Sequence, residues 1–330
     1  MSEFPTTILA GVVDASPERG GGLTGTLLRA GVSVTALAIV ASRIDLRAVR
    51  DGLTALDWPW MLGAASTVCS AILLSAVKWR VLLRSRERAL PLTRLIRHYL
   101  VGLFFNNFLP TSVGGDVVRA WDVGRDLDDT SEGAASVVAE RLIASVGLAL
   151  TAAIGLPFVR VGAPVYVAVA VVFVVGAGLA GLFLVPSLSE RMVSSAMGRR
   201  FEGVAGWLGA TTRITGEVLR DKRTVLLVLA LSVLFQVLVA AVTWFIFRAL
   251  GAEVSLVECV VYTSIVSAVT MVPVSISGHG VREAGYAYFF ALAGVAPATA
   301  VTASMLFFAT VAVCTLPGAA FFAAGRRHAS

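Results

Sequence analysis

Two short polar segments interrupt otherwise apolar sequence, and both contain residue types that bind anions. The first reads PTSVGGDVVR over 110–119 and the second PVSISGHGVR over 273–282. Glycine lets backbone N–H groups approach a ligand closely, and a helix that begins after such a break presents partial positive charge at its N-terminus. Arginine can grip a phosphate with two parallel N–H bonds. The two segments therefore predict a site for an anionic, phosphate-containing group.

The candidate binding residues lie in and around these two breaks and in one later apolar segment. Glu140 and Arg141 are adjacent, so on a helix they point about 100° apart and each needs its own partner. We expect those partners to be arginines and carboxylates of the breaks. The full set of predicted substrate-binding residues is Asn106, Asn107, Ser112, Gly114, Gly115, Asp116, Arg119, Glu140, Arg141, Ser275, Ser277, Gly278, His279, Gly280, Arg282 and Glu283.

The composition places these polar residues in a membrane protein. The 330 residues are 57% hydrophobic and only 15% charged, whereas soluble domains carry about 25% charged residues. This excludes a secreted disulfide scaffold and a nucleic-acid-binding module. The three cysteines lie in apolar segments without a CxxC pair, and the three histidines are scattered. The sequence accordingly predicts no metal and no cofactor.

Apolar runs and their breaks predict the membrane-crossing segments. They lie near 27–44, 58–80, 95–109, 133–156, 163–186, 224–250, 256–272 and 297–324. Basic residues gather at 78–97, at 191–223 and at the C-terminal Arg326 and Arg327. Because Lys and Arg in short loops are retained on the cytoplasmic side, these clusters predict that both termini lie in the cytoplasm.

This orientation constrains the two broken segments. Segments 92–131 and 251–296 must each enter and leave the membrane on the same side, so we predict an all-α protein with six full spans and two re-entrant hairpins. The breaks align with Pro110 on Pro273 and Arg119 on Arg282, and the same shift along the chain places other spans on each other. This predicts an inverted repeat, about 27–160 and 161–325, of the kind that places transporter sites at broken helices.

Two less specific interpretations stay open at this point. Each broken segment could be an ordinary kinked span, and the two arginines could simply neutralise Asp116 and Glu283 as structural ion pairs. The flanking sequence predicts a disordered cytoplasmic leader over 1–26, one membrane domain over 27–325 and a basic tail over 326–330.

The motifs resemble those of a known family. NNFLP at 106–110 continuing to Arg119, the SVVAERL run at 136–142 and SGHGVRE at 277–283 are similar to blocks of the flippase-like family named for the transmembrane region of lysylphosphatidylglycerol synthase. The resemblance covers roughly residues 27–325. It implies an integral inner-membrane protein that moves a lipid across the bilayer or helps modify it, without the soluble aminoacyl-transferase domain.

These observations together predict a flippase or scramblase for a phospholipid or a lipid-linked glycan. The expected ligand is an amphiphile with an anionic head, such as a polyprenyl-phosphate-linked sugar, and no nucleic acid is expected to bind. Two alternatives belong to other classes. One is a membrane-embedded transferase that acts on polyprenyl-phosphate sugars, with Asp116 or Glu140 as general base. The other is a non-catalytic subunit that works with envelope-lipid biosynthesis enzymes.

Overall fold

The computed structural model describes residues 53–54, 56–108, 114–159, 161–184, 202–271 and 280–326. Several of the sequence-based expectations concern residues outside these ranges. They are the leader 1–26, the first span 27–44, the tail beyond Arg326, and the break residues Ser112, Ser275, Ser277, Gly278 and His279.

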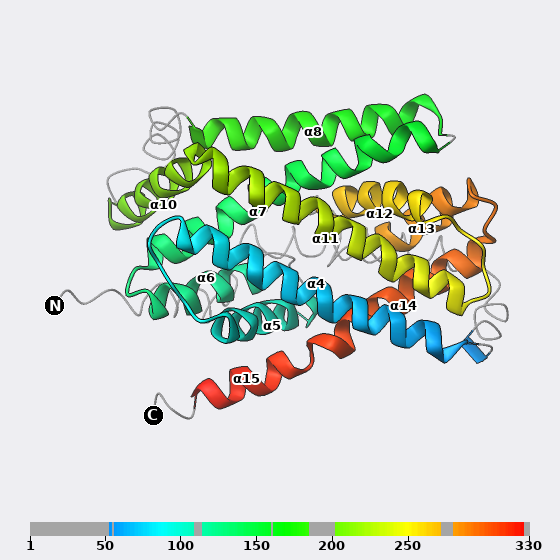
Figure 1. Ribbon diagram of the computed structural model, residues 1–330, viewed down its shortest axis with the longest axis horizontal. Helices are drawn as coiled ribbons and strands as arrows, with labels where there is room; N and C mark the ends of the chain where they lie inside the picture. The colour runs from blue at the N-terminus through cyan, green and yellow to red at the C-terminus, as the bar shows by residue number, and fades with distance from the viewer. Residues whose placement is uncertain are drawn as a thin grey trace, which may run out of the picture.

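The described part of the chain is helical and contains no β-strand (Figure 1). The elements are α4 (Trp58–Arg84), α5 (Leu92–Phe108), α6 (Gly114–Asp126), α7 (Thr130–Gly155), η1 (Leu156–Phe158), α8 (Ala163–Leu184), α10 (Glu202–Arg220), α11 (Lys222–Ala249), α12 (Leu256–Met271), α13 (Val281–Ala291), α14 (Pro297–Thr315) and α15 (Pro317–Arg326).

Four of the described helical segments are long and apolar enough to cross a membrane. They are Trp58–Arg84, Thr130–Phe158, Lys222–Ala249 and Pro297–Ala323. The shortest of them has 27 residues, which at 1.5 Å per residue reaches about 40 Å and exceeds the roughly 30 Å hydrocarbon core. The structure therefore shows a multi-pass helical membrane protein.

Four other helices are shorter than a span. Helices α5 and α12 have 17 and 16 residues, and α6 and α13 have 13 and 11. The longest of them measures about 26 Å and the shortest about 17 Å. The chain breaks between α5 and α6 and between α12 and α13, at the two polar segments identified in the sequence.

The shift that aligns the two breaks carries each of four helices onto a later one. When Arg119 is placed on Arg282, the bounds of α4 fall on 221–247, beside the observed Lys222–Ala249. In the same way α5, α6 and α7 fall on α12, α13 and α14. Neighbours recur as well: α5 packs on α6 and α6 on α7, as α12 packs on α13 and α13 on α14.

The two sets of helices run in opposite directions (Figure 1). Helix α4 runs from right to left in that view and α11 runs beside it from left to right. The α5–α6 pair lies toward the left end and the α12–α13 pair toward the right end. The C-terminal end of α4, the start of α11 and the end of α15 all lie at the left, so the described basic residues at these helix ends share one end of the molecule.

Close backbone contact holds α5 against α6. A Cβ atom on Gly115 would collide with the carbonyl oxygen of Gly102, and one on Gly102 would lie 2.9 Å from the carbonyl oxygen of Gly115. Asn106 Oδ1 accepts a 2.8 Å hydrogen bond from the backbone N–H of Gly115. The two glycines thus permit the approach that places the polar face of α6 against α7.

Candidate functional site

Three helices bring a cluster of charged side chains together inside the protein. Arg119 of α6 places Nη2 2.8 Å from Oε2 of Glu140 on α7, and Lys78 of α4 places Nζ 3.2 Å from Oε1 of the same carboxylate. The side chains of Arg119 and Lys78 are only 4% and 3% exposed. Glu140 therefore lies between two buried cations.

The neighbouring arginine takes the second carboxylate. Arg141 donates from Nε and Nη2 to the two oxygens of Asp116, at 2.8 and 2.9 Å. Asp116 also lies 3.6 Å from Nη2 of Arg119, one turn along α6. The side chain of Arg141 is 48% exposed. As expected for adjacent helical residues, Glu140 and Arg141 have different partners.

The charges of this cluster do not cancel. Lys78, Arg119 and Arg141 carry three positive charges against the two carboxylates of Asp116 and Glu140, which leaves an excess of one positive charge. Arg141 supplies the third positive charge and is 48% exposed, so the excess lies at the exposed edge of the cluster.

Arg119 also keeps one unused donor. Its Nε is buried and has no hydrogen-bond partner among the described residues, whereas Nη2 is paired with Glu140. Its guanidinium lies over the rings of Trp79 and Tyr99, at 4.6 and 4.9 Å. Trp79 is fixed in turn by a 2.9 Å bond from Nε1 to Ser136. The aromatic faces hold the guanidinium in place without occupying its N–H groups.

The second break is built differently. Gly280 has a φ of 82°, a left-handed conformation that favours glycine, and its N–H donates a 2.6 Å bond to Glu283 Oε2. Arg282 places Nη2 3.1 Å from Glu283 Oε1 and donates from Nε to Ser304 at 3.2 Å. Arg282 and Glu283 therefore form the neighbouring ion pair that the sequence left open as a structural alternative.

The two breaks are equivalent in position and unequal in charge. The shift that carries Arg119 to Arg282 takes Glu140 to Ala303 and Arg141 to Ser304. Among the described residues, Arg119 lies close to Asp116 and Glu140, and Arg282 lies close to Glu283 and Ser304. The sequence predicts one site with both arginines, and part of that set lies outside the described residues. Within the described residues, the cluster around Arg119 has an excess of one positive charge.

The remaining predicted residues that the structure describes lie around these clusters. Gly114 and Gly115 open α6, and Asn106 caps that start. Asn107 reaches the other repeat, because its Nδ2 donates a 2.9 Å bond to Thr315 Oγ1 of α14. These residues position the α5–α6 pair.

Lys78 is a site residue that the sequence did not predict. Its neighbours indicate a basic cytoplasmic loop, and that interpretation is wrong because α4 continues to Arg84. The signal was present: Lys78 is followed by Trp79 and by an apolar run over 81–83, so the helical pattern does not stop at residue 80.

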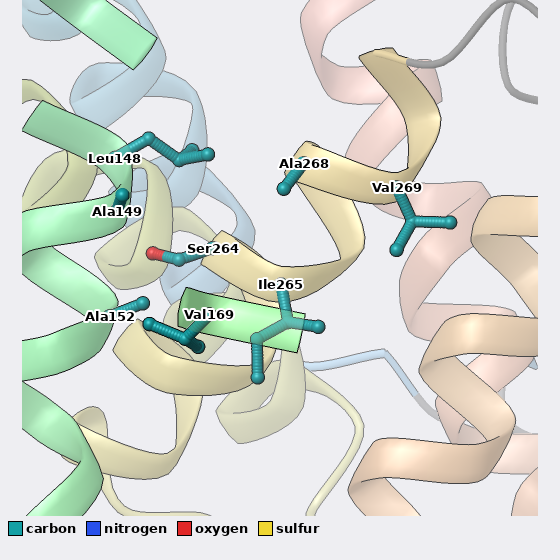
Figure 2. A pocket seen from close by; sticks show the side chains of 8 residues that line it. All are labelled: Leu148, Ala149, Ala152, Val169, Ser264, Ile265, Ala268 and Val269. Carbon is teal, nitrogen blue, oxygen red and sulfur yellow. The ribbon is translucent and has the colours of Figure 1, made fainter. Parts of the chain in front are cut away.

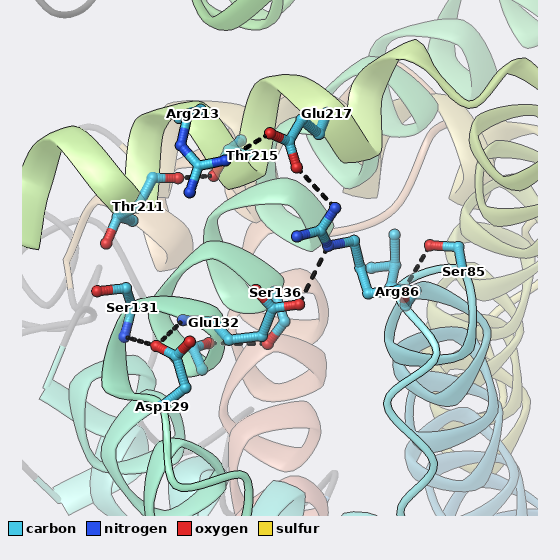
Figure 3. A network of polar contacts seen from close by, with 12 residues as sticks. Ser85, Arg86, Asp129, Ser131, Glu132, Ser136, Thr211, Arg213, Thr215 and Glu217 are labelled. Atoms are coloured by element: carbon cyan, nitrogen blue, oxygen red, sulfur yellow. Dashed lines mark hydrogen bonds and ion pairs between the residues drawn. The ribbon is translucent and has the colours of Figure 1, made fainter.

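A second polar network joins the helix ends at the basic end of the molecule (Figure 3). Arg86 lies 3.1 Å from Glu132 of α7 and 2.7 Å from Glu217 of α10. Burial lowers the pKa of Arg86, but the bonds to the two glutamates outweigh this effect and raise that pKa above its ordinary value. Asp129 caps α7 by accepting from the backbone N–H groups of Ser131 and Glu132. The network fixes the entry to α7, which carries Glu140 and Arg141.

A small cavity between α7, α8 and α12 is apolar (Figure 2). Its volume is about 20 Å³, enough for roughly one water molecule. It is lined by Leu148, Ala149, Ala152, Val169, Ser264, Ile265, Ala268 and Val269. It is too small and too apolar to hold a charged head group, so the charged cluster is the candidate site.

Comparison with known proteins agrees with the resemblance seen in the motifs. The sequence model described as the lysylphosphatidylglycerol synthase TM region matches residues 26–318. A UPF0104 membrane protein of Methanothermobacter thermautotrophicus is 24% identical over 299 residues, covering 83% of this chain and 88% of that protein.

Proposed function

Because the chain belongs to the family of the lysylphosphatidylglycerol synthase transmembrane region, we propose that it moves a lipid with an anionic, phosphate-containing head group across the membrane. The candidate substrates are a phospholipid and a polyprenyl-phosphate-linked glycan. The main supporting observation is the excess positive charge of the cluster around Arg119, in which Lys78 and Arg119 are buried and Arg141 is half exposed.

An anion would complete this cluster. A phosphodiester bound beside Arg119 cancels the excess charge and accepts from the buried Nε, which has no hydrogen-bond partner among the described residues. Hydrogen bonds to charged groups contribute about 1.5–3 kcal/mol, and an unmade bond of this kind costs a similar amount. A neutral head group would supply acceptors but leave the charge uncompensated.

Arg141 provides the route by which a head group reaches Arg119. Its side chain is half exposed, and it shares Asp116 with Arg119. A phosphate can therefore compete with Asp116 for Arg141 first and then pass to the buried guanidinium.

The helix lengths support a broken-helix transporter architecture. Helices α5, α6, α12 and α13 are too short for full spans, and each pair returns toward the end from which it came, so we assign two re-entrant hairpins. The four long apolar helices, with α8 and the predicted first span, give six crossings. Helix α8 has 22 residues without a charged side chain.

The charge distribution supports the orientation. The end that carries Arg84, Arg86, Arg94, Arg220 and Lys222 faces the cytoplasm under the positive-inside rule. The α5–α6 hairpin then opens to the cytoplasm and the α12–α13 hairpin to the outer face. Rocking of one repeat against the other would expose the head-group site to each leaflet in turn.

The test uses proteoliposomes that contain a fluorescent phosphatidylglycerol and a fluorescent phosphatidylcholine, with dithionite quenching as the readout of leaflet position. We expect wild-type protein to move the anionic probe faster. Arg119→Gln and Arg141→Gln should each slow it at least tenfold, because each removes a cation from the path. Arg125→Gln is the matched control, since Arg125 is exposed on the same helix.

Two results would overturn the proposal. One is transport of the anionic probe at the wild-type rate by correctly folded Arg119→Gln and Arg141→Gln protein. The other is a new covalent lipid product, detected by mass spectrometry, which would support a membrane-embedded transferase instead. Arg141→Gln keeps the test decisive if the buried Arg119 variant fails to fold.

A further inference from the structure

His98 of α5 lies between two carboxylates of α6, outside the cluster described above. Its Nε2 is 3.0 Å from Oδ2 of Asp126, and its Nδ1 is 3.7 Å from Oδ2 of Asp122. The imidazole is 10% exposed, whereas the side chain of Asp126, at the end of α6, is 28% exposed. Figure 1 places this end of the α5–α6 pair at the basic end of the molecule.

The hydrogen bonding of His98 is incomplete in the neutral form. A carboxylate accepts, so Nε2 donates to Asp126 and Nδ1 of a neutral imidazole carries only a lone pair. That nitrogen is buried without a hydrogen-bond partner among the described residues, and it faces a second carboxylate. A second proton on the ring would turn this repulsive contact into an ion pair with Asp122.

The net charge of the residues around neutral His98 is negative, which favours binding of that proton. Arg94, one turn earlier on α5, lies 3.7 Å from Asp126 and is well exposed. Helices α4, α6, α14 and α15 pack on α5. Within this environment the described ion pairs of His98 are those with Asp122 and Asp126. The set formed by Arg94, Asp122 and Asp126 has a net charge of −1 while His98 is neutral.

This pair of carboxylates is connected to the head-group cluster. Arg119, Asp122 and Asp126 are spaced three and four positions apart, so they lie on one face of α6. Tyr99, next to His98, contacts the guanidinium of Arg119. The rise along the helix puts the imidazole on the order of 10 Å from Arg119. A charge change at His98 therefore alters the potential at the anion site.

We propose that His98, held between Asp122 and Asp126, is a proton-binding site that couples proton uptake from the cytoplasmic end to binding of the anionic head group. This rests on the proposed function, because it names the ion that accompanies the lipid. A proton on His98 adds positive charge near Arg119 and so strengthens anion binding. By thermodynamic reciprocity the bound anion strengthens proton binding to the same extent.

The size of the coupling follows from Coulomb's law. A unit charge about 10 Å away in a medium of effective dielectric about 20 changes the affinity for an anion on the order of tenfold. We therefore expect the affinity for phosphatidylglycerol, measured between pH 8 and pH 5.5, to be about tenfold higher when His98 carries its second proton than when it is neutral. The phosphodiester stays ionised across this range, so the ligand itself contributes no pH dependence.

The first measurement does not depend on transport. Full-length protein labelled with ¹⁵N-histidine in nanodiscs gives imidazole resonances, and the one lost in His98→Gln is that of His98. We expect the pH midpoint of this signal to move upward when phosphatidylglycerol replaces phosphatidylcholine. A His98 signal that keeps one protonation state, or a midpoint unchanged by the anionic lipid, would overturn the proposal.

The second measurement is the pH dependence of phosphatidylglycerol affinity by microscale thermophoresis. His98→Gln should abolish the tenfold change, and Asp122→Asn should reduce it because the proton on Nδ1 loses its partner. His328→Gln, which removes a histidine of the tail, is the control and should keep it. If lipid binding and the His98 titration are linked but no lipid is transported, the coupling stands and the transport proposal fails. If phosphatidylglycerol is transported but its affinity does not depend on pH, the transport proposal stands and the coupling proposal fails.

Discussion

Glu140→Gln is the substitution that most directly tests the buried charge cluster. The change keeps the shape of the side chain and removes one negative charge. Lys78 and Arg119 lie 3.2 and 2.8 Å from that carboxylate and are almost fully buried. Without it, the cluster's excess rises from one positive charge to two, and Asp116 alone faces the cations.

The expected loss of stability is large. Removing one partner of a buried ion pair costs about 3–5 kcal/mol, because the other charge stays buried and unpaired. Arg141→Gln provides the comparison within the same cluster. Its side chain is 48% exposed, and pairs of exposed charges contribute about 0–1 kcal/mol. Adjacent residues thus differ in their effect on stability by several-fold.

Thermal unfolding in detergent, followed by size-exclusion chromatography after heating, measures the difference. At about 2 °C per kcal/mol for a chain of this size, Glu140→Gln should lower Tm by at least about 6 °C and Arg141→Gln by about 2 °C or less. The double variant Lys78→Met with Glu140→Gln should regain part of the loss. A coupling energy of at least about 1 kcal/mol between the two sites is expected for residues in contact.

A Tm for Glu140→Gln within about 2 °C of wild type would refute the argument, since that shift corresponds to an exposed pair. So would equal losses for Glu140→Gln and Arg141→Gln, since burial would then not distinguish the two pairs. An additive double variant would show that Lys78 and Glu140 do not interact energetically.

Three further predictions concern the scaffold. Gly115→Ala should cost about 1–3 kcal/mol through overpacking and lower the yield of folded protein, whereas Gly209→Ala, with open space at its Cβ, should not. Arg86→Gln should destabilise the protein by about 1–2 kcal/mol in denaturant titrations, because the buried Glu132 loses its partner. Arg213→Gln, which removes one residue of an exposed pair, should leave the free energy of unfolding nearly unchanged. The hydrogen bond from the Thr224 hydroxyl, together with backbone N–H bonds, lowers the pKa of Asp221. The stabilisation that ionised Asp221 gives the folded protein is therefore present above the ordinary aspartate pKa and is lost as pH falls through the lowered pKa. The Tm of Asp221→Asn should accordingly decline less with acid than the Tm of wild type.

The positions of the breaks and the shift between the repeats could be predicted from the sequence, and both follow from local chemistry. Proline and glycine interrupt helices wherever they occur, and apolar runs of about 20 residues are read directly from the chain. The shift, found from the two short break motifs, also relates α4 to α11 and α7 to α14. Glu140 and Arg141 were also predicted to have separate partners, because their angular separation is a property of the helix.

The identity of those partners depended on tertiary structure. Lys78, Tyr99 and Trp79 lie on helices whose relative rotation is set by packing, so nothing in their spacing places them beside Arg119. Lys78 is buried because α4 continues beyond it. In the sequence, the arginines near Lys78 indicated a loop, although apolar residues follow it. No sequence motif indicated His98, because the carboxylates of Asp122 and Asp126 belong to α6 and His98 to α5.

The sequence alone determined that the chain is a membrane protein, where its helices break, and that charged residues lie near those breaks, because composition and helical periodicity are local properties. Tertiary structure decided the charge balance. Arg119 and Arg282 occupy equivalent positions in the two break motifs. Arg282 lies beside the carboxylate of Glu283, whereas Arg119 belongs to a cluster with an excess of one positive charge. That difference arises only when three helices pack together, since burial is what makes an unbalanced charge matter.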